Sequence, residues 1–319
     1  MPYNILVTRR PPGDAIDRLV ASNDVWVWPH NSKIERDVLL ARVAEAEGLY
    51  CMLTDRIDAE LLDAAPKLRV VSNMAVGVDN IDLAECERRG IAVGHTPGVL
   101  TDSTADTAWT LLMASSRRIE EAIDYVKAGE WGPWDPAGML GYDISGTTLG
   151  IIGMGRIGSA VARRSLGFNM EILYSERESK DAVEQETGAT RVSFEELLER
   201  SDHVVLCVAL TDETRGLIDA DAFKRMKPTA NLVNISRGPI VDTDALYDAL
   251  STGEIRCAGL DVIDPEPIPA DHPIVALENC TVIPHLGSAT ERTRIAMADL
   301  AEANLIDGLN GEPMPARIV

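Results

Sequence analysis

The sequence predicts an α/β protein with two parallel-sheet domains, and three observations lead to this fold class. Short apolar segments alternate with amphipathic helical stretches along the chain. The alternation starts twice, first near residue 4 and again near residue 149. The chain has 319 residues, too many for one comfortable hydrophobic core and about right for two domains. Strands separated by helices cannot pair as hairpins, so both sheets are expected to be mainly parallel.

The first series of elements occupies the first hundred residues. Each expected strand is a short apolar run, and each expected helix is amphipathic. Strands are expected at 4–8, 25–28, 49–53, 69–73 and 91–93, and helices at 14–21, 34–46, 59–65 and 82–89.

One long helix is expected over residues 101–127, followed by a Gly/Pro/Trp-rich loop at 129–142. The second series then begins, and a helix at 289–309 closes the chain. Between them, strands are expected at 149–152, 171–174, 203–208, 231–234, 257–261 and 281–283, and helices at 156–166, 194–200 and 243–252.

Composition and charge exclude several classes of function. Hydrophobic residues make up 45% and charged residues 25%, which is typical of a globular protein. The net charge of −21 disfavours binding to nucleic acid or to anionic membranes. No apolar run approaches the ~20 residues of a membrane span, and the N-terminus lacks the order of a signal peptide. We therefore expect a cytoplasmic protein with neither nucleic-acid nor membrane partners.

The five cysteines are widely spaced and form no C-x-x-C motif. Reduced thiols in the cores are therefore the expectation, rather than a disulfide scaffold or a zinc ribbon. Histidines and carboxylates do not cluster along the chain either, so no metal site is predicted.

A G-x-G-x-x-G motif follows the first strand of the second series and opens a helix. It consists of Gly153, Gly155 and Gly158, with Arg156 and Ile157 before the last glycine. The first glycine permits a tight turn, the second lets a pyrophosphate approach the backbone, and the third lets helix and strand pack closely. The helix N-terminus adds amide donors and a positive dipole end. A dinucleotide site is therefore predicted.

The residues after the next strand bear on the choice of cofactor. A ribose-binding acid is usual here for NAD, whereas an arginine accommodates the 2′-phosphate of NADP. Ser175 and Arg177 favour NADP(H). NAD(H) is the alternative, because Glu176 would hold the ribose itself and, with Glu178, would repel a phosphate. A solvated charged turn is the structural alternative.

Three polar residues follow the last three strands of the second series: Arg237, Glu266 and His285. The carboxyl ends of strands in a doubly wound sheet open onto the ligand crevice. Each residue alone also has a structural interpretation, as a surface ion pair, an acid in a proline-rich loop and a buried histidine. Their shared position downstream of one nucleotide motif favours a catalytic set.

The chain resembles the D-isomer-specific 2-hydroxyacid dehydrogenases over nearly its whole length. The final GEPMP, the EWGPWDP loop and the C-terminal third are most similar to the glyoxylate/hydroxypyruvate reductases of that family. The segments that carry the resemblance are AVGVDNID, GMGRIG, NISRG, GLDVIDPEP and PHLGSAT.

The resemblance implies NAD(P)H-dependent reduction of a small 2-keto acid to the D-2-hydroxy acid. The substrate carboxylate would bind near Arg237 and the backbone amides of Val76 and Gly77. Arg237 would also polarise the ketone oxygen, which His285 would protonate as general acid. Glu266 would accept a hydrogen bond from the other ring nitrogen of His285, fixing its orientation and stabilising its protonated form.

The resemblance also implies roles for residues around these three. Asp261 would contact the nicotinamide carboxamide, and Ala209 and Ile235 would line the cofactor cleft. Gly287 and Ser288 would lie at the mouth of the site near the general acid, with Ser288 among the substrate contacts.

An arm at about residues 118–145 would clasp a second subunit, giving a homodimer. Trp134 would reach into the partner's substrate pocket. The structural alternative is that Trp131 and Trp134 only pack an interface or cap a core.

The implied domain division is not sequential. Residues 1–99 with 288–319 would form a flavodoxin-like substrate domain. Residues 100–287 would form a Rossmann cofactor domain, with the active-site cleft between the two.

Two other functions stay open. One is a D-2-hydroxyacid dehydrogenase for another 2-keto acid, such as a phosphoglycerate- or lactate-type substrate. The other is a catalytically silent NAD(H)-sensing regulator, which the presence of Arg237, Glu266 and His285 disfavours.

Overall fold

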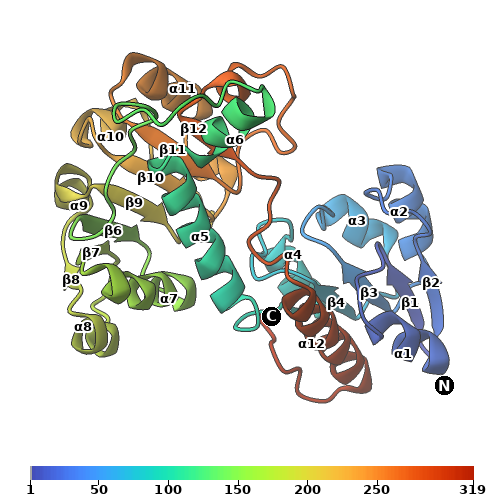
Figure 1. The fold of residues 1–319 in the computed structure, drawn as a ribbon. Coiled ribbons are helices and arrows are strands. Elements are labelled where there is room, and N and C mark those ends of the chain that lie inside the picture. Colours follow the sequence, from blue (N-terminus) through green and yellow to red (C-terminus); the bar gives the residue numbers. More distant parts are fainter. Residues whose placement is uncertain (1) are drawn as a thin grey trace. The chain divides into compact units, whose positions relative to one another are not determined.

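The computed structural model describes residues 2–319, which form two compact units (Figure 1). Unit 1 comprises residues 2–100 with Ser288–Val319, and unit 2 comprises Thr101–Gly287. Each unit contains one parallel sheet with helices on both faces (Figure 1). Within residues 2–319, no helix is both long and apolar enough to cross a membrane.

Unit 1 has a five-stranded sheet in the order β2-β1-β3-β4-β5, which is the flavodoxin-like order. The C-terminal helix α12 packs on β3 and β4, and the Ser72 hydroxyl of β4 donates to the Ala301 carbonyl of α12 at 2.7 Å. The strands are β1 (Asn4–Val7), β2 (Asp24–Val27), β3 (Gly48–Cys51), β4 (Val70–Asn73) and β5 (Ala92–Gly94). The helices are α1 (Ala15–Ser22), α2 (Arg36–Val43), α3 (Ala59–Ala64), α4 (Leu83–Arg89) and α12 (Glu291–Asn310).

Unit 2 has a seven-stranded sheet in the order β12-β11-β10-β9-β6-β7-β8, which is the Rossmann order extended by one strand. The strands are β6 (Thr148–Ile152), β7 (Glu171–Ser175), β8 (Thr190–Arg191), β9 (His203–Leu206), β10 (Asn231–Asn234), β11 (Cys257–Leu260) and β12 (Cys280–Val282). The helices are α5 (Thr101–Ser116), α6 (Ile119–Lys127), α7 (Arg156–Ser165), α8 (Asp181–Thr187), α9 (Phe194–Arg200), α10 (Ala220–Arg225) and α11 (Thr243–Thr252). Short 3₁₀ turns lie at Leu166–Phe168, Gly238–Ile240 and Pro273–Ala276.

The sheet of unit 2 is covered on both faces, so its strands are continuous apolar runs rather than alternating ones. Val204 and Leu232 point into a core shared with α9, α10 and α11. Their chain neighbours Val205 and Val233 point into a second core with α5 and α7. Both sequence-predicted α/β series therefore fold into doubly wound parallel sheets, and the predicted fold class is confirmed.

The single helix expected over residues 101–127 is wrong, because two helices occupy this segment. Arg118 has φ +54°, a left-handed conformation that interrupts the α-helical hydrogen bonds between α5 and α6. At the end of α5, the Asn231 side chain donates to the hydroxyls of Ser115 and Ser116. These tertiary bonds hold the last residues of α5, so the helix ends at Ser116 even though the helical pattern of the sequence continues beyond it.

Burial of His203 at the start of β9 predicts an acid-labile contribution to stability. The side chain is 3% exposed, and burial lowers its pKa to about 4 from 6.5. Between these values the unfolded chain binds a proton that the folded chain does not, so stability falls as the pH falls. From pH 7.5 to 5 the wild type should lose about 2 kcal/mol more unfolding free energy than His203→Gln, measured in urea. An equal pH dependence in the two proteins would contradict this.

Candidate active site

Three predicted catalytic residues lie beyond the carboxyl ends of three neighbouring strands in unit 2. Strands β10, β11 and β12 pair in parallel, with Asn234 opposite Leu260 and Leu260 opposite Val282. Arg237, Glu266 and His285 follow these strands, so the sheet carries all three to one edge.

His285 and Glu266 form a direct pair. The ring Nδ1 of His285 lies 2.7 Å from Glu266 Oε1, with the side chains 23% and 40% exposed. Because the carboxylate oxygen can only accept, Nδ1 carries the proton and Nε2 is left for a ligand. The structure therefore brings together the two residues expected to act as general acid and its partner.

The backbone of His285 is held by Asp261, which directly follows β11. His285 has φ +54°, and its N–H donates to the Asp261 carbonyl at 2.9 Å. The buried Asp261 carboxylate accepts from the backbone N–H groups of Leu286 and Gly287. Burial raises the pKa of Asp261, while these two amides oppose the rise. Asp261 and Gly287 thus shape the turn that presents the histidine.

Arg237 is half-buried at the end of the loop after β10. Its Nη1 donates to the Ser236 carbonyl at 2.9 Å, and Asn234 Nδ2 donates to the Arg237 carbonyl at 2.9 Å. The next residue must be glycine, because a Cβ at Gly238 would lie 2.2 Å from the Ile263 carbonyl carbon. The loops after β10 and β11 therefore pack backbone against backbone beside the arginine.

The glycine motif forms the turn between β6 and α7. Gly153 has φ +92°, and its N–H donates to the Ser175 carbonyl at 3.0 Å. A Cβ at Gly158 would lie 2.1 Å from the Gly153 oxygen, whereas one at Gly155 would meet nothing within 4 Å. Space is thus open where a pyrophosphate would approach, and Arg156 and Ile157 begin the helix behind it. These features fit a dinucleotide.

The acidic residue Glu176 directly follows β7 and contacts the glycine turn. Glu176 Oε2 accepts a hydrogen bond from the Met154 N–H at 3.2 Å. Arg177 forms an ion pair with Glu213, and both side chains are exposed. Arg191 of β8 donates to the carbonyls of Glu176 and Arg177, which ties this loop to the sheet edge.

The remaining predicted cofactor residues lie near this edge of unit 2. Ala209 is exposed in the loop after β9, and Ile235 is buried directly after β10. Strands β6 and β9 are neighbours at the point where the strand order reverses, which is where a doubly wound sheet binds its ligand.

The predicted substrate residues Val76, Gly77 and Ser288 belong to unit 1. Val76 and Gly77 follow β4, so they lie at the carboxyl edge of the other sheet. Ser288 begins the segment that leads into α12. Their contacts with substrate stay a prediction.

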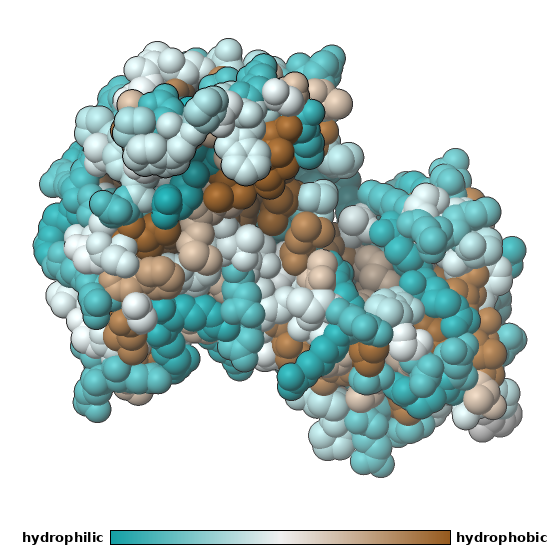
Figure 2. All heavy atoms as spheres, viewed as in Figure 1, coloured by the Kyte–Doolittle hydropathy of each residue, from teal (hydrophilic) through white to brown (hydrophobic). Residues whose placement is uncertain are grey.

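The predicted arm exposes its apolar side chains. Trp131 and Trp134 are 73% and 86% exposed, so neither caps a core of this chain. Helix α6 has no buried residue, and Ile119 and Ile123 are nearly half exposed. Figure 2 shows hydrophobic residues gathered in patches on the viewed face of unit 2.

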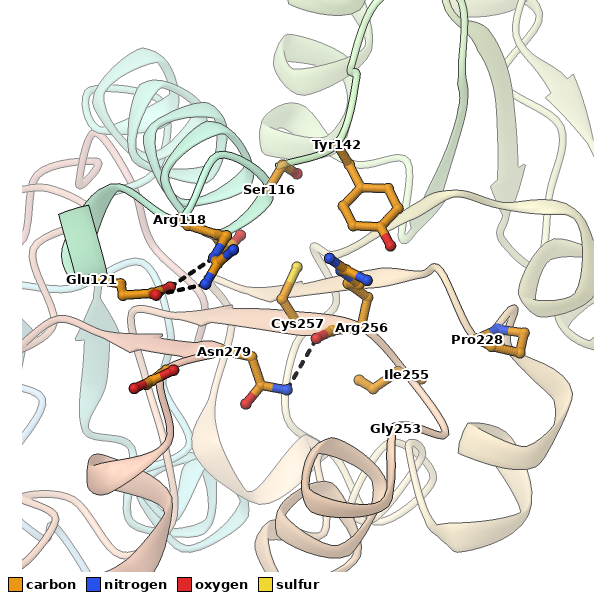
Figure 3. Close-up of a pocket in the computed structure, with 12 residues that line it drawn as sticks. Ser116, Arg118, Glu121, Tyr142, Pro228, Gly253, Ile255, Arg256, Cys257 and Asn279 are labelled. Carbon is orange, nitrogen blue, oxygen red and sulfur yellow. Dashed lines mark hydrogen bonds and ion pairs between the residues drawn. The ribbon is translucent and has the colours of Figure 1, made fainter. Parts of the chain in front are cut away.

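A polar pocket of about 370 Å³ lies at the opposite, amino-terminal edge of the same sheet (Figure 3). The Arg256 guanidinium stacks over the Tyr142 ring at 3.8 Å, and Arg118 pairs with Glu121. No predicted catalytic or cofactor residue lines this pocket. Across residues 2–319, no group of three or more His, Cys, Asp or Glu side chains is placed to hold a metal ion.

Sequence reasoning missed Arg191 and Glu213 near the cofactor loop. Arg191 lies on a strand of two residues, too short for an apolar pattern, and the helix before it was not predicted. The signal available was Gly188, which caps that helix in a left-handed conformation and marks its end.

A Rossmann sheet with an open glycine turn, an arginine and a carboxylate-bound histidine at one edge defines an NAD(P)-dependent oxidoreductase. Residues 109–287 match the family model of the D-isomer specific 2-hydroxyacid dehydrogenase, NAD binding domain. The chain belongs to the D-isomer-specific 2-hydroxyacid dehydrogenases.

Three relatives show how far the similarity extends. A glyoxylate reductase of Thermococcus kodakarensis is 49% identical over 98% of this chain and 95% of its own length. The crystal structure of a Thermus thermophilus protein has a TM-score of 0.92 and 45% identity, covering 99% of this chain and 100% of that one. The NADPH-dependent glyoxylate/hydroxypyruvate reductase of Sinorhizobium meliloti, solved with NADP and malonate, has a TM-score of 0.87 and 30% identity over 100% and 97% of the two chains.

Proposed function

We propose that this protein reduces glyoxylate and hydroxypyruvate to glycolate and D-glycerate with NAD(P)H. The observation that carries the proposal is the His285–Glu266 hydrogen bond at the same sheet edge as Arg237. The relatives named glyoxylate reductase, which share almost the full chain, support the substrate class.

The three residues divide the chemistry among them. The glycine turn would hold the pyrophosphate of a reduced dinucleotide, whose nicotinamide would supply the hydride for C2 of the keto acid. Arg237 holds a positive charge where the ketone oxygen becomes negative, which lowers the energy of the transition state. His285 donates the proton from Nε2 to that oxygen, and Glu266 keeps the ring oriented and stabilises its positive charge.

We also propose that unit 1 contributes to substrate binding and that a second copy of the chain forms a homodimer with this one. The backbone amides of Val76 and Gly77 and the side chain of Ser288 are proposed to contact the substrate. The exposed Ile119 and Ile123 of α6 and the exposed Trp131 and Trp134 support a homodimer in which the 118–145 arm meets the partner. A monomeric mass in light scattering would contradict the dimer. The cytoplasmic location stays a prediction.

The experiment is a comparison of initial rates of NADPH and NADH oxidation at 340 nm with glyoxylate and with hydroxypyruvate. Turnover with either cofactor supports the proposed reaction. Absence of turnover with both substrates would favour another 2-keto acid, tested next with a substrate panel. Failure of the whole panel would leave the silent NAD(H)-sensing regulator.

Cofactor choice depends on Glu176. The NADP(H) preference expected from Ser175 and Arg177 stays a prediction. The Glu176 carboxylate on the glycine turn and the Arg177–Glu213 ion pair instead favour NAD(H). A 2′-phosphate beside this carboxylate would meet a like charge.

Glu176→Gln should therefore raise the ratio of kcat/KM with NADPH to that with NADH by about tenfold, because it removes the charge but keeps an acceptor oxygen. Glu178→Gln removes the other carboxylate expected to repel a phosphate, but solvent screens this exposed side chain, so the ratio should stay within about twofold. An unchanged NADPH-to-NADH ratio of kcat/KM in Glu176→Gln would show that this carboxylate does not discriminate between a ribose 2′-hydroxyl and a 2′-phosphate. A loss of NADPH activity in Arg177→Ala alone would assign the 2′-phosphate to Arg177.

A further inference from the structure

A hydrogen-bond network joins two loops at the carboxyl edge of the sheet in unit 1. Loop A, residues 52–55, follows β3, and loop B, residues 74–79, follows β4 and contains Val76 and Gly77. These strands are neighbours, so the loops leave the sheet side by side.

Asn80, which directly follows loop B, reaches loop A with its side chain. Its Nδ2 donates to the carbonyls of Asp55 at 2.9 Å and Met52 at 3.3 Å, the two ends of loop A. Its Oδ1 accepts from Asn73 Nδ2 at 3.1 Å. One amide group thereby uses both donors and its acceptor, and its donors join the two loops.

The partners of Asn80 are themselves fixed. Asn73 is fully buried, and its Nδ2 also donates to the Gly77 carbonyl at 3.0 Å. Asp55 is 2% exposed, and its carboxylate accepts from the Met52 N–H at 2.9 Å and from the Thr8 hydroxyl. Asn80 therefore links a rigid turn in loop A, through Asn73, to the Gly77 carbonyl in loop B.

The Val76 peptide is held from a second direction. Its carbonyl lies 2.9 Å from Nδ1 of His95, and the Thr96 N–H donates to the neighbouring Ala75 carbonyl at 2.8 Å. These bonds fix carbonyl groups of loop B and use neither the N–H group of Val76 nor that of Gly77. When the carbonyl groups of a loop are held by the protein, its backbone N–H groups are oriented and can bind an anion.

We propose that Asn80 is a positioning residue for substrate binding, because its side-chain amide fixes loops A and B and so preorganises the Val76 and Gly77 amides for a carboxylate. This inference rests on the proposed function for the identity of the substrate. The chemistry favours this role over simple stability, since every side-chain bond of Asn80 ends on loop A or on Asn73, the residue directly before loop B. Preorganised amides lower the entropy lost when an anion binds.

The test compares Asn80→Ala and Asn80→Ser with Asn23→Ala. Asn23 is also half-buried in unit 1 and also donates to a carbonyl, that of Leu19, but it lies at the amino edge of the sheet before β2. Steady-state kinetics give KM for glyoxylate and for the cofactor. Hydrogen exchange by mass spectrometry follows peptides covering 52–55 and 74–79, and it needs no activity.

Asn80→Ala should raise KM for glyoxylate about tenfold, with kcat within about threefold and KM for the cofactor unchanged. Its loops A and B should exchange faster than in the wild type, with Asn80→Ser intermediate and Asn23→Ala like the wild type. Asn80→Ser retains a hydroxyl donor and serves where the alanine variant does not fold.

Three outcomes would overturn the inference. The first is an unchanged glyoxylate KM in both Asn80 variants. The second is unchanged exchange in loops A and B. The third is a parallel rise in both KM values, which indicates general destabilisation. If the wild type reduces no keto acid, the proposed function fails, and exchange alone then decides whether Asn80 holds the loops.

Discussion

Replacing Arg237 by alanine should lower kcat/KM for the keto acid about 10³-fold, because one preorganised donor is worth about 10²–10³ in rate and this one also carries a charge. The protein has a net charge of −21, and its substrate is an anion. Distant carboxylates are largely screened beyond a Debye length of ~8 Å at physiological salt, so a cation at contact range dominates the local field. Initial rates over a range of substrate concentrations measure the loss.

Arg237→Lys is the matched variant. It keeps the charge but loses the planar fork that binds a carboxylate through two parallel hydrogen bonds, so its activity should fall between those of the wild type and the alanine variant. Binding of the reduced cofactor, followed by its fluorescence, should be the same in all three proteins. Near-wild-type kinetics in Arg237→Ala would remove this residue from the catalytic site.

Replacing His285 by glutamine should lower kcat for keto-acid reduction about 10³-fold, within the range of general acid catalysis. Glutamine can still donate a hydrogen bond, but it cannot deliver a proton. Glu266→Gln should cost less, about tenfold to 10²-fold, since it keeps an acceptor for Nδ1 and removes only the charge. Single-turnover rates measure both effects even where product release limits the wild type.

His30→Gln provides the control for the histidine change. His30 is exposed in unit 1 and contacts Trp28 edge to face, so its replacement should leave the single-turnover rate unchanged. Equal rates in His285→Gln and the wild type would require another proton donor. A larger loss in Glu266→Gln than in His285→Gln would show that the carboxylate acts on the substrate itself.

The fold and the glycine turn could be predicted because their causes are local. The strand before Gly153 is an apolar run. Each glycine of the motif meets a separate backbone requirement: Gly153 has a positive φ, Gly155 faces open space, and Gly158 packs closely on the Gly153 carbonyl. The position of Arg237 and His285 after strands was also predictable, since parallel strands carry their following residues to one edge.

Features that depend on tertiary neighbours could not be predicted from the pattern. The break at Arg118 comes just after Ser115, which is bonded to Asn231, a residue more than a hundred positions away. The two-residue β8 pairs only because β7 lies beside it. The pairing of Arg177 with Glu213 and the bonds of Asn80 to loop A likewise form only once the sheets have brought the loops after different strands together.

The path of the chain sets an order for folding during synthesis. Unit 2 is one continuous segment that precedes α12, so all of its strands emerge from the ribosome before α12 does. Unit 1 at that stage has its five strands but lacks the helix that covers β3 and β4. The apolar face of β3 and β4 therefore stays uncovered until the last residues of the chain have emerged. A nascent chain stalled before α12 is the form of this protein in which aggregation and chaperone binding are most expected.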